Sequence, residues 1–304
     1  MTFFATFFTI LISHLLLNII IHLRIRLSLK MDFYNFVEWK FDKGLFDFVD
    51  ATYVLHLEGS PRLKRVKEQL FANPLTKKIF LVNNPGFRKV SKPLPIQNSE
   101  ADCAFSHYIA CKHALANNYR TVLILEDDFI LEKSCLELSS TDISGIKNYI
   151  NSDIDHYFLG CTPLIAIPSS WNLKHWKVIK GGTTHAMVHT FGGATKIVED
   201  YEKNSSTIGG IDMYIFGNHS CHMYYKPLIT QTFPDTENKL TCWGSGNLGN
   251  NIASGYINIV GLDKQTQPGY DFLYFISKIA VLLIILLLVF VILIIKWIYL
   301  KFKA

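Results

Sequence analysis

The sequence TVLILEDDFI, residues 121–130, decides the fold class of this chain. Its first five residues are typical of a strand that is buried on both faces. The strand runs directly into Glu126, Asp127 and Asp128, although acidic residues are depleted in strands and three adjacent like charges repel one another. A hard divalent cation such as Mg²⁺ or Mn²⁺ takes oxygen ligands and would relieve this repulsion. An acidic loop that caps the next helix is the alternative that these residues alone leave open.

The segments on either side of this strand alternate between strand and helix patterns. Further strands are predicted at 51–57, 78–82, 157–160 and 184–190. Helices are predicted at 61–70, 100–117 and 192–201. This alternation predicts an α/β fold with a mainly parallel sheet, whose ligands bind beyond the carboxyl ends of the strands. The carboxylates at 126–128 are therefore expected in a binding site. No GxGxxG or Walker A motif is present, which disfavours a dinucleotide or P-loop enzyme.

The composition indicates a membrane segment near the carboxyl end. Of the 304 residues, 49% are hydrophobic and only 18% are charged, which is too apolar for a purely soluble protein of this size. Residues 279–295 carry no charge, and with its flanks the stretch 272–299 exceeds the roughly 20 residues that span a bilayer. Aromatic residues that we expect at the two membrane interfaces flank it: Tyr270, Tyr274, Trp297 and Tyr299. A short basic tail, 300–304, follows.

The amino-terminal segment 1–30 is a weaker membrane candidate. Residues 3–23 lack charged side chains, but basic residues follow this run instead of preceding it, which disfavours a cleaved signal peptide. A second span and an amphipathic surface helix both stay open. Basic residues flank both hydrophobic segments, so the charge rule does not fix which side of the membrane the domain faces. The mixed aromatic and charged residues 31–50 show no clear period and are predicted to form a connector.

The charge and the cysteines exclude other classes of function. The net charge is +5, and the basic residues are dispersed or lie beside the hydrophobic segments, so no nucleic-acid partner is expected. The six cysteines form neither a CxxC pair nor a zinc-finger spacing. They are predicted to be buried thiols, with disulfides as the alternative for a lumenal domain.

Several segments, in order along the chain, resemble glycosyltransferase family 25, which includes lipopolysaccharide galactosyltransferases and collagen hydroxylysine galactosyltransferases. The segments that carry the resemblance are YVLHLEGSPR at 53–62, EADCAFSH at 100–107, LILEDD at 123–128, THAMV at 184–188 and IDM at 211–213. The resemblance extends over residues 52–232. His56 and Gly59 depart from it, because the family usually has Asn and Arg at these positions.

The resemblance implies a GT-A-like, Rossmann-like catalytic domain, assigned here to residues 51–265, and a membrane-anchored enzyme. The donor would be a UDP-hexose carrying galactose or glucose, used with a divalent metal that is usually Mn²⁺. The acceptor would be a hydroxyl of a glycan, a lipid-linked saccharide or a collagen-like protein. A catalytically silent GT-A-like domain, serving as a membrane scaffold or glycan-binding module, is the rival interpretation.

The resemblance also suggests a role for each acidic residue. Asp128 is the expected metal ligand, Glu126 would contact the metal or the nucleotide, and Asp127 would lie close to the donor sugar. A metal bridging both phosphates would stabilise the charge that develops on the UDP leaving group. Arg62 would pair with the diphosphate or form a structural salt bridge. Asn83 and its neighbour Asn84 would contact uracil or ribose, or only form a turn.

Asp212 is the candidate general base, because an inverting transferase must deprotonate the acceptor hydroxyl. Its alternative role is that of an N-capping residue after Gly209 and Gly210. Four histidines have two open roles each, as ligands or as structural residues. His107 and His185 could contact substrate or donor, and His219 or His222 could complete a metal shell.

Overall fold

The computed structural model describes residues 34–90, 92, 96–233 and 248–303. The strands are β1 Asn35–Lys40, β2 Ala51–Leu57, β3 Lys78–Asn84, β4 Thr121–Glu126, β5 Phe129–Leu131, β6 His156–Pro168, β7 His175–Thr190, β8 Cys221–Tyr224 and β9 Ile229–Gln231. The helices are α2 Leu63–Ala72, α3 Ser99–Ala116, α4 Lys133–Leu136, α5 Ser140–Ile150, α6 Phe191–Lys203, the 3₁₀ turn η1 Ser205–Ile208, α7 Ile211–Asn218, α9 Leu248–Val260 and α10 Gly269–Lys303. The predicted α/β class is confirmed.

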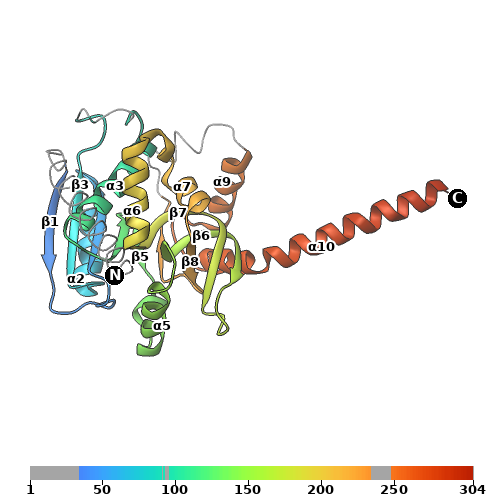
Figure 1. Ribbon diagram of the computed structural model, residues 1–304, viewed down its shortest axis with the longest axis horizontal. Helices are drawn as coiled ribbons and strands as arrows, with labels where there is room; N and C mark the ends of the chain where they lie inside the picture. The colour runs from blue at the N-terminus through green and yellow to red at the C-terminus, as the bar shows by residue number, and fades with distance from the viewer. Residues whose placement is uncertain (1–33, 91, 93–95, 234–247, 304) are drawn as a thin grey trace, which may run out of the picture.

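A mixed sheet of seven strands, in the order β1-β3-β2-β4-β7-β6-β8, forms the centre of the domain (Figure 1). β3, β2 and β4 are parallel, as predicted. β7 runs antiparallel to both β4 and β6, so the prediction of a mainly parallel sheet is wrong for this half. For β6 and β7 the physical reason is the short connection at 169–174, because a parallel crossover needs a dozen or more residues.

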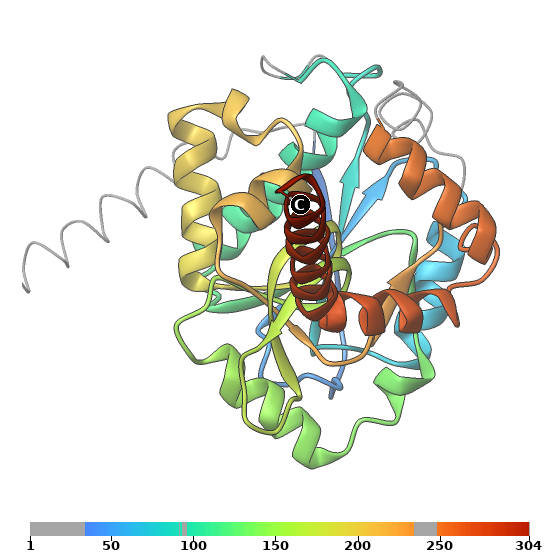
Figure 2. The same ribbon diagram turned by 90° about the vertical axis from the view of Figure 1, so that its right-hand side faces the viewer.

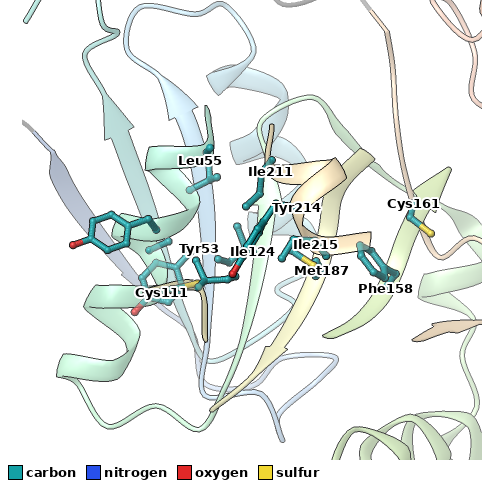
Figure 3. Close-up of a cluster of buried hydrophobic side chains, with 14 of the residues drawn as sticks. Tyr53, Leu55, Cys111, Ile124, Phe158, Cys161, Met187, Ile211, Tyr214 and Ile215 are labelled. Carbon is teal, nitrogen blue, oxygen red and sulfur yellow. The ribbon is translucent and has the colours of Figure 1, made fainter. Parts of the chain in front are cut away.

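Helices cover both faces of the sheet and make two apolar cores. On one face α3, α6 and α7 pack over β2 and β4, with Tyr53 and Ile124 fully buried beneath them. Figure 3 shows this core, in which Tyr53, Cys111 and Tyr214 come from three different elements. On the other face α2 and α5 pack over the alternate residues of the same strands. This two-sided burial explains why the core strands have near-continuous apolar sequences.

The segment predicted as a connector, 31–50, contributes the edge strand β1. It pairs antiparallel with β3, with Asn35 opposite Asn83. Most of its side chains are exposed or half-buried, so the strand lacks the apolar alternation by which a strand is recognised. Trp39 packs against Phe71 of α2 at a ring-centroid distance of 5.1 Å, which holds the edge strand to the body of the domain.

The long helix α10 leaves the body of the domain and extends away from it (Figures 1 and 2). Its segment Gly269–Lys296 has a mean hydropathy of 3.5 and is long and apolar enough to cross a membrane. Every side chain from 282 to 295 is exposed. This segment is consistent with the predicted membrane-spanning helix at 272–299. The second candidate anchor, at 1–30, lies outside the described residues.

The first turns of α10 belong to the folded domain. Tyr270 and Tyr274 are 0% and 1% exposed and lie in the core that β6 covers, so their predicted position at a membrane interface is wrong. Tyr274 Oη lies 3.9 Å from Cys161 Sγ, and Lys278 Nζ donates a 2.5 Å hydrogen bond to the Tyr225 carbonyl. A domain boundary at 265 would therefore cut through packed core.

Candidate active site

A cavity of about 340 Å³ lies at the carboxyl ends of β2, β3 and β4. Its walls come from His56 and the residues after β2, the segment after β3, the first two turns of α3, and residues 126–128 after β4. Asn98 opens α3 by accepting a 2.8 Å hydrogen bond from the Ala101 amide, which fixes the start of the helix at the cavity. The acidic stretch predicted to form a site therefore does line a cavity.

Four carboxylates from two distant parts of the chain converge beside this cavity. Glu126 is the last residue of β4, and Asp127 and Asp128 follow it directly. Thr184 of β7 links Glu126 to Asp212 of α7, because its Oγ1 donates a 2.8 Å hydrogen bond to Asp212 Oδ1 and lies 3.3 Å from Glu126 Oε1. Asp212 itself does not line the cavity and lies behind Glu126.

Burial makes the ionised forms of these carboxylates costly. It raises the pKa of Glu126 to about 7, with a further contribution from the charge of Asp127. Burial and the Glu126 charge together raise the pKa of Asp212 to about 6, and the same two causes hold the pKa of Asp128 well above its usual range. Within the described part of the chain, Asp128 Oδ1 is buried without a hydrogen-bond partner. An excess of negative charge and an unpaired carboxylate oxygen are what a divalent cation would neutralise.

Asp127 is held by two partners. Arg62, at the start of α2, places its Nε 2.7 Å from Asp127 Oδ1, and His56 Nδ1 donates a 2.7 Å hydrogen bond to Asp127 Oδ2. Arg62 thus forms the structural salt bridge that was one of its two predicted roles, while still lining the cavity. His56 replaces an Asn of the family pattern, and its longer side chain reaches the carboxylate. Gly59 has a φ of +84°, a conformation that disfavours the Arg usual at this position.

The opposite wall of the cavity contains a second polar cluster. Asn84 Nδ2 donates hydrogen bonds to Asp102 Oδ2 at 3.1 Å and to Ser106 Oγ at 3.0 Å. Lys92 forms an ion pair with Asp102, and burial lowers the pKa of this lysine. Asn84 lines the cavity, whereas Asn83, the predicted nucleotide contact, lies opposite Asn35 in the strand ladder and does not line it.

Three of the four candidate histidines have partners outside the cavity. His185 Nε2 donates to the Ile229 carbonyl at 3.1 Å, in a packed region where a Cβ on Gly160 would lie 2.6 Å from that nitrogen. His219 Nδ1 lies 2.8 Å from His156 Nε2, and His222 Nδ1 lies 2.7 Å from the Tyr149 hydroxyl. None of the three lines the cavity.

His107 differs from these three. It is 0% exposed, and neither ring nitrogen has a hydrogen-bond partner among the described residues. Its Nε2 lies 3.7 Å from Glu126 Oε1. Burial lowers the pKa of His107 to about 4, so the ring is neutral near pH 7 and can act as a ligand. Cys103, one turn earlier on α3, lines the cavity beside it. The sequence analysis did not select Cys103, although its spacing of four from His107 within a predicted helix is a usable signal.

The Asp212 N-cap alternative is wrong. Gly210 is the N-cap of α7 and makes no side-chain capping bond, and Asp212 lies in the first turn. Its Oδ2 accepts a 3.0 Å hydrogen bond from the Thr183 amide, which belongs to β7 and not to the helix. The carboxylate is therefore held against the sheet, towards Glu126.

Parallel strands with carboxylates and a cavity at their carboxyl ends define an α/β enzyme of the class that binds its ligand at the sheet edge. Residues 35–157 match the family described as glycosyltransferase family 25 (LPS biosynthesis protein). This match covers less than half of the chain and supports a glycosyltransferase of the family 25 type, an enzyme that takes a nucleotide-sugar donor and a glycan-type acceptor. The matched residues include 126–128 but not Asp212.

Two solved structures show more distant similarity. The crystal structure of A197 from STIV is 15% identical, with a TM-score of 0.36, over 57% of this chain and 80% of that one. The structure of a glycosyltransferase involved in the glycosylation of the major capsid of PBCV-1 is 10% identical, with a TM-score of 0.33, over 60% of this chain and 92% of that one. No curated protein sequence matches the chain.

Proposed function

We propose that this glycosyltransferase transfers a hexose, galactose or glucose, from a UDP-sugar to a hydroxyl group, with the help of a divalent cation and with inversion at the anomeric carbon. The observation that carries the proposal is the convergence of Glu126, Asp127, Asp128 and Asp212 beside the cavity. Their buried, mutually repelling charges favour the binding of a cation, which would offset the repulsion.

Asp128 and Glu126 are the residues that would hold the cation. The unpaired buried oxygen of Asp128 and the raised pKa of Glu126 both fit an oxygen-ligand site for a hard ion such as Mn²⁺. When bound, such an ion neutralises the charge that develops on the departing UDP. Asp127 keeps its position through Arg62 and His56, so these two residues fix the acidic loop between strand β4 and strand β5.

The cavity has room for part of a nucleotide sugar. Its volume of about 340 Å³ lies at the lower end of the usual range for ligand pockets, roughly 300–1,000 Å³. Asn84 is the proposed nucleoside contact because it lines the cavity at the end of β3, and its amide would exchange the hydrogen bonds that it donates to Asp102 and Ser106 for bonds to the nucleoside. It replaces Asn83 in this proposed role.

Asp212 is the proposed general base. A base works best with a pKa near the working pH, and its pKa of about 6 meets that condition. Hydrogen bonds from Thr183 and Thr184 fix the orientation of its carboxylate. Asp212 does not line the cavity, so the proposal requires the acceptor hydroxyl to reach this carboxylate from outside the cavity. His185 then supports this region from behind, by joining β7 to β9.

The helix α10 supports a membrane location. The apolar stretch emerges directly from the core that lies behind the catalytic sheet, so the site is held at a fixed distance from the membrane. An acceptor displayed at a membrane, such as a lipid-linked or lipopolysaccharide-type saccharide, fits this arrangement. A collagen-like protein hydroxyl is the second acceptor class, and comparing UDP release with each of the two acceptors added in turn separates them.

The test uses the full-length protein in detergent micelles with a panel of UDP-sugars, with and without Mn²⁺, and follows the release of UDP. We expect release from one hexose donor that depends on Mn²⁺ and is lost in Asp128→Asn. Asp153→Asn, on an exposed loop, is the matched control and should keep full activity. Equal turnover by Asp128→Asn would contradict the proposed metal ligand.

A further inference from the structure

Three potential metal ligands, chemically different from the all-oxygen set of the acidic cluster, lie close together at the wall of the cavity. Cys103 and His107 lie four residues apart on α3 and therefore on the same helix face. Glu126 reaches the same point from the end of β4. One ligand atom from each of the three side chains, a sulfur, an imidazole nitrogen and a carboxylate oxygen, lies within 4.8 Å of the other two.

The unpaired imidazole of His107 is the independent observation that indicates a ligand. Its side chain is 0% exposed, and both nitrogens lack hydrogen-bond partners among the residues that the structure describes. Buried polar side chains in folded proteins are almost always paired. A neutral imidazole nitrogen 3.7 Å from Glu126 Oε1 is too far away for a hydrogen bond but is placed to share a metal ion with it.

The distances fit a small tetrahedral ion. Zinc–ligand bonds of roughly 2.0–2.3 Å place neighbouring ligand atoms about 3.3–3.8 Å apart. The separation of His107 Nε2 and Glu126 Oε1, 3.7 Å, already lies in this range. The Cys103 sulfur needs to approach by about 1 Å at most, which rotation about its single side-chain torsion supplies. Cys103 lines the cavity, so an ion can enter from there.

We propose that Cys103, His107 and Glu126 form a binding site for a borderline-soft divalent ion of the Zn²⁺ class, with water as the fourth ligand. A thiolate and an imidazole select such an ion over Mg²⁺ or Mn²⁺, which prefer oxygen. The site shares Glu126 with the proposed hard-ion site. When zinc occupies it, Glu126 is no longer available to hold the hard ion together with Asp128. The inference stands on these three side chains and does not depend on which sugar, if any, is transferred.

The experiment titrates the full-length protein in detergent micelles with Co²⁺, a spectroscopic substitute for zinc, in buffer without other divalent ions. We expect a near-ultraviolet thiolate-to-cobalt charge-transfer band that saturates at one ion per chain and disappears when Zn²⁺ is added. Cys103→Ser should abolish the band, and His107→Gln should weaken cobalt binding at least tenfold. Cys111→Ser, two turns along the same helix, is the matched control and should leave the band unchanged.

A second measurement on the unaltered protein guards against misfolding of the variants. Zn²⁺ should slow alkylation of Cys103 by a small thiol reagent at least tenfold, as read by peptide mass spectrometry, while Mg²⁺ should not. A charge-transfer band that persists in Cys103→Ser, or alkylation of Cys103 at the same rate with and without Zn²⁺, would overturn the proposal. Neither readout uses sugar transfer, so a failure here is distinguishable from a failure of the proposed function.

Discussion

Replacing Glu126 by Gln should stabilise the metal-free protein at alkaline pH and leave its stability at pH 5 nearly unchanged. The substitution keeps the shape of the side chain and removes one charge from the buried acidic cluster. Burial and the charge of Asp127 raise the pKa of Glu126 from 4.5 to about 7. The folded protein therefore binds this proton more tightly than the unfolded chain does.

The size of the effect follows from this pKa. One pKa unit corresponds to about 1.4 kcal/mol, so a rise from 4.5 to about 7 corresponds to about 3.5 kcal/mol. The side chain is 26% exposed, and solvent screening reduces the expected gain to about 1–2 kcal/mol. The sign is fixed by linkage. The stability of the unaltered protein falls as the pH rises between about 4.5 and 7, and the Gln variant escapes that part of the loss.

The assay is urea unfolding of the full-length protein in detergent micelles with EDTA, at pH 5 and pH 8. Glu137→Gln, which alters an exposed glutamate paired with Lys133, is the matched control and should change stability by less than about 0.5 kcal/mol at both pH values. Adding Mn²⁺ should restore stability to the unaltered protein more than to Glu126→Gln. A variant that is equally destabilised at both pH values would refute the description of Glu126 as a strained, buried carboxylate.

Three other substitutions test separate parts of the structure. Tyr274→Ala should lower the free energy of unfolding by about 3 kcal/mol in thermal or urea unfolding, because it removes a fully buried side chain. Phe272→Ala, which removes a side chain that is 53% exposed, should lower it by less than about 1 kcal/mol. Similar losses for the two variants would contradict the burial of this helix turn. Arg62→Ala should lower the free energy of unfolding by about 2 kcal/mol, because Asp127 loses its ion pair. The same variant should raise the KM for the donor in steady-state assays. An unchanged KM and an unchanged stability would refute this role of Arg62. Asp212→Asn should lower kcat about 100-fold with little change in KM. It should also remove the fall in rate that the unaltered enzyme shows as the pH drops below about 6. A variant that keeps this fall in rate at acidic pH would exclude Asp212 as the base.

The sequence predicted the acidic end of β4 because local and global requirements agree there. Residues 122–125 are apolar since both faces of β4 are covered, and the carboxylates follow at the edge where the chain leaves the sheet. The helix predicted at 100–117 agrees with α3 within one residue at each end, and Asn98 caps its start. The family match over residues 35–157 confirms the resemblance for the segments at 53–62, 100–107 and 123–128, whereas the segments at 184–188 and 211–213 lie outside the matched residues.

The features that the sequence did not predict depend on packing between distant segments. The choice between Asn83 and Asn84 is a choice of strand register, since a shift of one residue reverses which side chain faces the cavity. Thr184, which links Glu126 to Asp212, has no distinguishing sequence signal, because a threonine in a strand is ordinary. Tyr270 was assigned to a membrane interface because buried and interfacial tyrosines have the same sequence signature beside an apolar helix.

The binding of UDP to the full-length protein in detergent micelles, measured by calorimetry with Mn²⁺ and then with EDTA, tests the central claim most directly. That claim is that the carboxylates at the end of β4 bind the donor through a cation. We predict that Mn²⁺ strengthens UDP binding at least tenfold and that Asp128→Asn abolishes this gain, while Asp153→Asn retains it. Equal UDP affinity with and without Mn²⁺, in a protein whose folding is unchanged, would contradict the account.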